Sequence, residues 1–155
     1  ETQKSMRHGL PLVLVMIDID DFKRYNDCNG HQKGDEALAK MAQLFKSACR
    51  GDDIVARYGG DEFAIVFPGA SKENAIELSS RIMNAVRTAS FEGEHLLPSG
   101  SLNVSIGVAC FPEHATNDED LISASDRALY AAKGAGGNTI KMTCPAAEDS
   151  VTDGK

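Results

Sequence analysis

The sequence is short of basic residues and has no cysteine pattern that binds metal. Its 16 lysines and arginines are outnumbered by 23 aspartates and glutamates, which gives a formal net charge of −7. A nucleic-acid groove needs a basic stripe, so nucleic acid is not expected as a partner. The four cysteines form no C-x-x-C pair and have no histidine at zinc-ligand spacing, a pattern typical of a reduced, cytoplasmic protein.

Long apolar runs and phosphate-binding loops are also missing. The apolar run after Arg7-His8 reaches Asp18 too soon for a signal peptide and is far too short to span a membrane. There is no Walker motif, no G-x-G-x-x-G after a strand, and no EF-hand, since Phe22 and Lys23 stand where ligands and glycine are needed. Any bound phosphate must therefore be held by a metal ion and lysines. The 155 residues suffice for one soluble domain with a real core.

The most informative segment that is present is YGGDEF at residues 58–63. It lies between two β-branched and aromatic runs, 53–58 and 63–67, and a Gly-Gly pair between such runs predicts a hairpin. A tight turn needs no acidic pair, and the neighbouring carboxylates of Asp61 and Glu62 repel one another. They therefore indicate a bound cation.

A second acidic cluster follows the apolar run 12–17, which predicts a strand covered on both faces. Asp18 and Asp20 are two positions apart, so they share a face while the chain stays extended. If this strand pairs beside the hairpin, Asp18 and Asp61 converge on one hard cation such as magnesium or manganese. The alternative is two solvated strand ends, and periodicity alone does not decide between them.

The remaining pattern alternates strands and helices. Gly34-Asp35 is a candidate helix start with Asp35 as N-cap, and 116–119 reads as a capping box. The expected elements are helices over 35–49, 71–86 and 116–133, a loop or edge hairpin over 91–100, and strands over 102–109 and 139–142. Together these predict an α+β fold, an α/β sandwich with helices over a mainly antiparallel sheet. Residues 144–155 are polar and are expected to fray.

Six segments together resemble the GGDEF-domain diguanylate cyclases of bacteria, over residues 10–142. In order, they are DIDDFK at 18–23, ND at 26–27, GHQKGD at 30–35, RYGGDEF at 57–63, SIG at 105–107 and DRALYAAK at 126–133. The resemblance implies a domain over 1–143 with the palm-like fold of nucleotidyl cyclases and polymerases, built on a sheet of about five strands.

The resemblance also implies the chemistry. Two GTP molecules condense to cyclic di-GMP with release of pyrophosphate, in a homodimer whose subunits each hold one GTP. Two magnesium or manganese ions per active site would lie on Asp18, the carbonyl of Ile19, and Asp61, where they neutralise phosphate charge. Asp61 or Glu62 would assist removal of the hydroxyl proton, and which of them does so stays open.

Further residues match the family's substrate-binding positions. Asn26 and Asp35 match its guanine readers, and a carboxylate that accepts from the guanine edge would reject adenine. Without the resemblance, the favoured interpretation of Asp35 is a helix cap, and that of Lys23 and Lys133 is solvated charges at helix ends. The other implied substrate-binding residues are Phe22, Lys23, Gly59, Gly60 and Lys133.

Arg50 and Asp53 match the family's R-x-x-D inhibitory motif, and Arg81 matches a second arginine that completes this product site. The alternative is that Arg50 only complements a helix C-terminus. The sequence departs from the family at Gly137, where an arginine is common, and in lacking the opening D-x-L-T-G-L-x-N-R segment.

We therefore expect an output domain with a sensor or regulatory domain outside this sequence, through which a cytoplasmic protein could also be membrane-anchored. The other hypothesis is a catalytically weak or inactive module that senses GTP or cyclic di-GMP.

Overall fold

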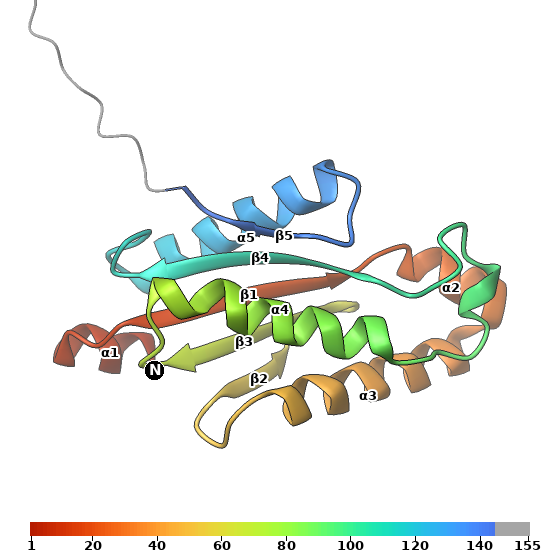
Figure 1. Cartoon of the computed structure of the whole chain (residues 1–155), viewed down its shortest axis with the longest axis horizontal. Helices are drawn as coiled ribbons and strands as arrows, with labels where there is room; N and C mark the ends of the chain where they lie inside the picture. Colours follow the sequence, from red (N-terminus) through yellow and green to blue (C-terminus); the bar gives the residue numbers. More distant parts are fainter. Residues whose placement is uncertain (145–155) are drawn as a thin grey trace, which may run out of the picture.

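The computed structural model describes residues 1–144, so the predicted tail lies almost wholly outside the described part of the chain. The helices and strands follow one another as drawn in Figure 1. They are α1 (Thr2–His8), β1 (Leu12–Ile19), α2 (Phe22–Asn29), α3 (His31–Ala48), β2 (Ile54–Arg57), β3 (Glu62–Pro68), α4 (Lys72–Thr88), the 3₁₀ helix η1 (Glu94–Leu96), β4 (Val104–Phe111), α5 (Asp118–Gly134) and β5 (Ile140–Met142).

The five strands form one sheet in the order β2-β3-β1-β4-β5. Every neighbouring pair is antiparallel except β4 and β5, which are parallel. The predicted α+β class with a mainly antiparallel sheet is therefore confirmed. β1 is the central strand of the sheet. Asp18, near the end of β1, and Asp20, just after it, therefore lie at the end of the central strand.

Helices cover both faces of this sheet, and β1 is buried along its whole length. Val13, Val15 and Ile17 face a core shared with α3 and α4, whereas Leu12 and Leu14 face a second core shared with α5. Figure 1 shows α4 in front of the sheet and α5 behind β4. The continuous apolar run is thus explained by the two-residue period of a strand with an apolar environment on each side.

The segment between β1 and the hairpin differs from the prediction, because it holds two helices. Gly30, at φ 86°, separates α2 from α3. α3 begins at His31 with Gly30 as its N-cap, so the expected cap role of Asp35 is wrong. The first turn of α3 is polar and mostly exposed, and apolar periodicity therefore becomes visible only later in the helix.

Two other local expectations are decided by the structure. Of the two alternatives for residues 91–100 the loop is present, and it contains η1. The Tyr25 hydroxyl donates to the Glu92 carbonyl in this loop at 2.7 Å. At α5 the cap is Asn117, whose side chain accepts from the Asp120 N–H at 2.8 Å, one position later than the predicted box. Among residues 1–144, no helix combines the length and apolarity that crossing a bilayer requires.

Candidate active site

The end of β1 and the β2–β3 turn meet as the two acidic clusters predicted. Asp18 is the register partner of Glu62 across the antiparallel β1–β3 pair. The Ile19 N–H donates to the Asp61 carbonyl at 3.1 Å, which ties the strand end to the turn. Sheet pairing alone therefore brings Asp18, Asp61 and Glu62 to one edge of the molecule.

The turn itself is held by backbone and by one arginine. The N–H groups of Tyr58 and Gly59 donate to the Glu62 carbonyl at 2.8 and 3.2 Å. The Arg57 guanidinium donates to the carbonyls of Gly59 and Gly60, with its shortest contact 2.6 Å to Gly60. Arg57 lies in the family-like segment, but nothing in the sequence indicated that it braces the turn.

The two glycines of the turn have different roles. A Cβ at Gly59 would lie 3.0 Å from Oε2 of Glu62, so this glycine makes room for the carboxylate. A Cβ at Gly60 would meet no atom within 4 Å, so its backbone borders open space. The expected close approach of a ligand to backbone is therefore available at Gly60.

Lys133, in the last turn of α5, reaches this acidic cluster. Its Nζ lies 2.5 Å from Oδ2 of Asp18, whose side chain is 10% exposed against 44% for Lys133. Burial raises the pKa of Asp18, and the nearby charges of Asp61 and Glu62 raise it further, although Lys133 acts in the opposite direction. Burial alone would lower the pKa of Lys133, but the hydrogen bond to Asp18 and the surrounding carboxylates raise it.

The oxygen donors at this edge suit a hard divalent cation. Carboxylates of Asp18 and Asp61 and the carbonyl of Ile19 are the ligand type that magnesium and manganese prefer. Among residues 1–144, no three acidic, histidine or cysteine side chains are already grouped to hold a metal ion. In this structure the cation that lies on Asp18 is the ammonium of Lys133.

Asp20 does not join Asp18, contrary to the expected shared face. β1 ends at Ile19, and the backbone turns at Asp21, which has φ 55°. The Asp20 carboxylate instead accepts from the Ser105 hydroxyl at 2.6 Å and the Asn138 N–H at 2.7 Å. The alternation argument fails because the strand stops one residue before Asp20.

Asn26 and Asp35 lie beside one another on α2 and α3. A Cβ at Gly34 would lie 1.8 Å from Asn26 Oδ1, so α3 needs a glycine there for Asn26 to fit. Asn26 Oδ1 is buried and has no hydrogen-bond partner among the described residues. Asp35 is exposed and lines a cavity of about 520 Å³ between α3, β2 and β3. The other residues lining this cavity are Leu38, Ala39, Ala42, Lys46, Val55, Arg57 and Phe63.

Two other candidates are less closely placed. Lys23 is exposed on the first turn of α2 and forms no ion pair within residues 1–144. Phe22 is 8% exposed and stacks against Tyr25, with ring centroids 6.1 Å apart. Phe22 therefore supports α2 from the core.

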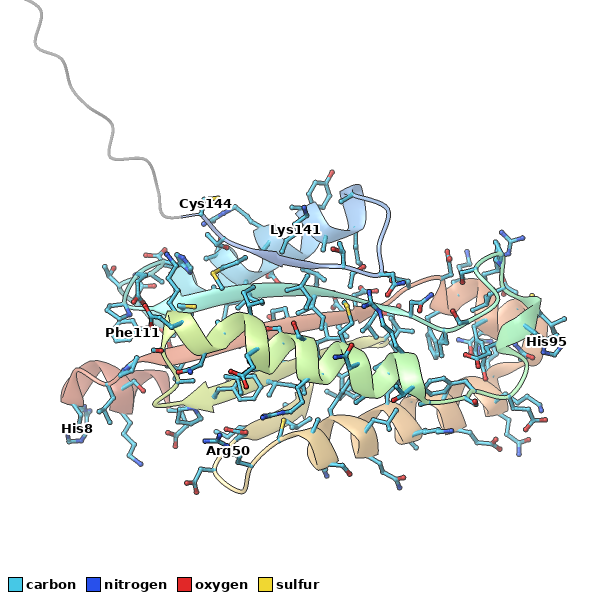
Figure 2. The ribbon with its side chains drawn as sticks, viewed as in Figure 1. His8, Arg50, His95, Phe111, Lys141 and Cys144 are labelled. Carbon is cyan, nitrogen blue, oxygen red and sulfur yellow. The ribbon has the colours of Figure 1, made fainter. Side chains whose placement is uncertain are left out.

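The three residues of the expected product site share a separate cavity of about 260 Å³. The Arg50 N–H donates to Asp53 Oδ2 at 2.7 Å. Nε and Nη2 of Arg81 are buried without a hydrogen-bond partner in the described part of the chain. Figure 2 shows Arg50 near the α3–β2 connection, at the opposite end of β2 from the acidic turn. The cavity is thus distinct from the acidic edge.

The chain is thus an α+β domain with acids at the end of its central strand and in the adjoining turn. The family model "Diguanylate cyclase, GGDEF domain" matches residues 1–139, and the chain belongs to this family.

Individual relatives agree with this assignment. The chain is 40% identical over 145 residues to diguanylate cyclase DosC of Escherichia coli, a match that covers 92% of the chain and 30% of DosC. The active GGEEF domain of a diguanylate cyclase from Vibrio cholerae is 32% identical with a TM-score of 0.81, covering 92% of this chain and 88% of that one. The GGDEF domain of DgcB from Caulobacter crescentus, solved with c-di-GMP, is 29% identical with a TM-score of 0.79, covering 91% and 82%. The chain thus spans about a third of the length of the curated relative DosC.

Proposed function

We propose that this chain is the catalytic domain of a diguanylate cyclase that condenses two GTP molecules into cyclic di-GMP and two pyrophosphates. The observation that carries the proposal is the convergence of Asp18 with Asp61 and Glu62 where β1 ends and β3 begins, beside Lys133. Membership of the family supplies the substrate class.

Two magnesium or manganese ions would be held by Asp18, the Ile19 carbonyl and Asp61, and when bound they neutralise phosphate charge and stabilise the attacking and leaving oxygens. Lys133 is partly exposed and exchanges Asp18 for a phosphate oxygen of GTP. Lys23, on the solvent side of α2, adds a second ammonium for the triphosphate. The backbone of Gly60, which borders open space, admits the phosphates close to the turn.

Recognition of guanine falls to Asn26 and Asp35. The Asp35 carboxylate accepts from the N1–H and N2–H₂ groups of guanine, and adenine lacks this pair of donors. The unpartnered Oδ1 of Asn26 offers a further acceptor from the neighbouring helix. A wrong base would leave the buried Oδ1 of Asn26 unpaired, and this cost makes the site reject that base strongly.

The remaining chemistry is a proton transfer in a paired active site. Asp61 or Glu62 takes the proton from the attacking 3′-hydroxyl of one GTP. Ring closure needs two such attacks, so two chains, each with one GTP, face each other in a homodimer. Two-fold symmetry lets the same residues serve both steps.

The cavity of Arg50, Asp53 and Arg81 binds the product and limits turnover. The unpartnered donors of Arg81 suit a phosphate or guanine acceptor, and Asp53 suits a guanine N–H group. The neighbour DgcB was solved with c-di-GMP, which fits this assignment. A sensor domain outside this sequence would control assembly in a cytoplasmic signalling protein.

The test is incubation of the chain with GTP and magnesium, followed by chromatography and mass spectrometry of the nucleotides. Cyclic di-GMP from GTP, with ATP left unchanged in a parallel reaction, is expected. Binding of GTP or cyclic di-GMP without product would instead establish the second candidate, an inactive sensor module. The seating of Lys133 on Asp18 is the observation that favours this alternative.

A further inference from the structure

Asp20 joins three segments that lie far apart in the sequence. Its Oδ1 accepts from the hydroxyl of Ser105, which is 0% exposed on β4, at 2.6 Å. Its Oδ2 accepts from the backbone N–H of Asn138, in the connection between α5 and β5, at 2.7 Å. Both carboxylate oxygens of Asp20 therefore accept hydrogen bonds from protein donors.

The α5–β5 connection has a shape that depends on this carboxylate. Gly136, Gly137 and Asn138 have φ values of 104°, 74° and 48°, in or beyond the left-handed region. A Cβ at Gly137 would lie 3.0 Å from Asp20 Oδ2, so a side chain there would require the carboxylate to shift by a few tenths of an ångström. Glycine is thus favoured at this position by both the positive φ angle and the space.

A second contact fixes the same connection from the other face of the sheet. Nε of Arg87, in the last turn of α4, donates to Oδ1 of Asn138 at 3.2 Å, and Nη2 donates to its carbonyl at 3.0 Å. Asn138 is therefore hydrogen-bonded through its N–H to Asp20, and through its side chain and carbonyl to Arg87. These contacts support the left-handed backbone of Asn138.

Lys133, whose ammonium lies on Asp18, is in the last turn of α5, just before the tethered connection. The end of β1 thus holds the end of α5 twice, through Asp18 to Lys133 and through Asp20 to Asn138. When Lys133 leaves Asp18 for a phosphate, the Asp20 contact remains as the direct link between the end of β1 and the α5–β5 connection.

We propose that Asp20 is a positioning residue: it holds the α5–β5 connection so that Lys133 stays within reach of the substrate phosphates. The phosphate part of this inference rests on the proposed function. The competing reading is that Asp20, two residues from Asp18, is a third metal-binding carboxylate.

Asp20→Asn and Asp20→Ala separate these readings. An asparagine keeps both hydrogen bonds, because its Oδ1 accepts from the Asn138 N–H and its amide donates to the Ser105 hydroxyl oxygen. It removes the charge that a metal ligand needs. An alanine removes both hydrogen bonds. Should Asp20→Ala not fold, Asp20→Ser is used, since its shorter side chain does not reach Asn138.

The first measurement is amide hydrogen exchange in nucleotide-free protein, followed on peptides that cover 133–139. Exchange should be faster in Asp20→Ala and unchanged in Asp20→Asn. The second measurement is the affinity for α,β-methylene GTP, determined by calorimetry in the presence of magnesium. This GTP analogue cannot release pyrophosphate. We expect Asp20→Ala to weaken binding about fivefold, the effect of one net hydrogen bond, and Asp20→Asn to bind like wild type.

A double-mutant cycle decides whether the effect passes through Lys133. In a Lys133→Ala background, Asp20→Ala should weaken binding no further. Equal weakening in both backgrounds, or a loss in Asp20→Asn as large as in Asp20→Ala, would overturn the proposal. Glu119→Ala, an exposed acid at the far end of α5, is the control for lost charge. If wild type makes no cyclic dinucleotide, the proposed function fails, while amide exchange still decides the tether.

Discussion

Nζ of Lys133 lies 2.5 Å from Oδ2 of Asp18, and the two residues are 115 positions apart in the chain. The contact places the only ammonium paired with the acidic cluster, among residues 1–144, on the carboxylate expected to bind metal. Asp18 nevertheless keeps a raised pKa, because burial and the charges of Asp61 and Glu62 outweigh its partner. The site is therefore short of positive charge.

This shortage predicts that Asp18→Asn stabilises the metal-free protein at neutral pH. A carboxyl whose pKa is raised by folding disfavours the folded state once it ionises, so the penalty is absent below the unfolded pKa and complete above the folded one. Removal of this charge should therefore raise the melting temperature of the metal-free protein. Calorimetry in chelator at pH 7 measures it.

Magnesium provides the matched control for that variant. Added ion should raise the melting temperature of wild type by binding the folded state, and should not do so in Asp18→Asn. A wild type whose stability ignores magnesium and manganese would contradict the assignment of Asp18 as a ligand.

Asp61→Ala should lose turnover and keep its fold. The carboxylate lies in a partly exposed turn, so its removal leaves no cavity, whereas a lost metal ligand removes several kcal/mol of transition-state stabilisation. Product formation should fall by roughly a hundredfold or more. Circular dichroism melts check the fold, and near-normal activity would disprove the metal role.

Asp35→Ala should weaken GTP binding or relax the preference for guanine over adenine. A charged hydrogen bond to the base contributes enough for a loss of about 10- to 100-fold in affinity. Because Asp35 lies inside α3 and is not its cap, alanine should leave the melting temperature unchanged or slightly higher. Unaltered affinity for GTP and for ATP would show that Asp35 is only a solvent-exposed helix residue.

Arg50→Ala should relieve product inhibition while the initial rate stays close to wild type. Arg50 lies in the second cavity with Arg81, away from the acidic turn, and makes no proposed contact with substrate. Progress curves with added cyclic di-GMP measure the inhibition, and calorimetry measures product binding. Identical inhibition of mutant and wild type would show that Arg50 is only a helix-end charge.

We expect the folded protein to lose stability in mild acid because of His114. Burial lowers the pKa of His114 below 6.5, and its Nδ1 accepts from the Cys110 N–H at 2.9 Å, which requires the neutral ring. The stabilisation is complete above the unfolded pKa and is lost as pH falls through about 6.5 toward the folded pKa. The melting temperature of wild type should therefore fall more between pH 7.5 and 5 than that of His114→Asn. Parallel curves would contradict this.

The acidic edge could be predicted from the sequence because it depends on local pattern and strand pairing. The apolar run before Asp18 indicated a strand buried on both faces, and the Gly-Gly pair before Asp61 indicated the hairpin. Antiparallel pairing of these two elements is enough to bring their acids together.

The tethers of the site could not be predicted in the same way. The bond from Asp20 to Asn138 depends on left-handed backbone in a loop 118 positions away, for which the glycines before Asn138 are the only local signal. The division of α2 from α3 was missed because Gly30 acts through its φ angle, while the polar first turn of α3 shows no apolar period.

The most direct test of the central claim is the ratio of products formed from GTP and magnesium. Mass spectrometry of the dinucleotide and an enzymatic pyrophosphate assay, run on one reaction at high protein concentration, give this ratio. Condensation of two GTP molecules predicts cyclic di-GMP and two pyrophosphates for each molecule of it, with no product from Asp61→Ala. Release of GDP and phosphate, or no conversion of GTP at any protein concentration, would contradict the account.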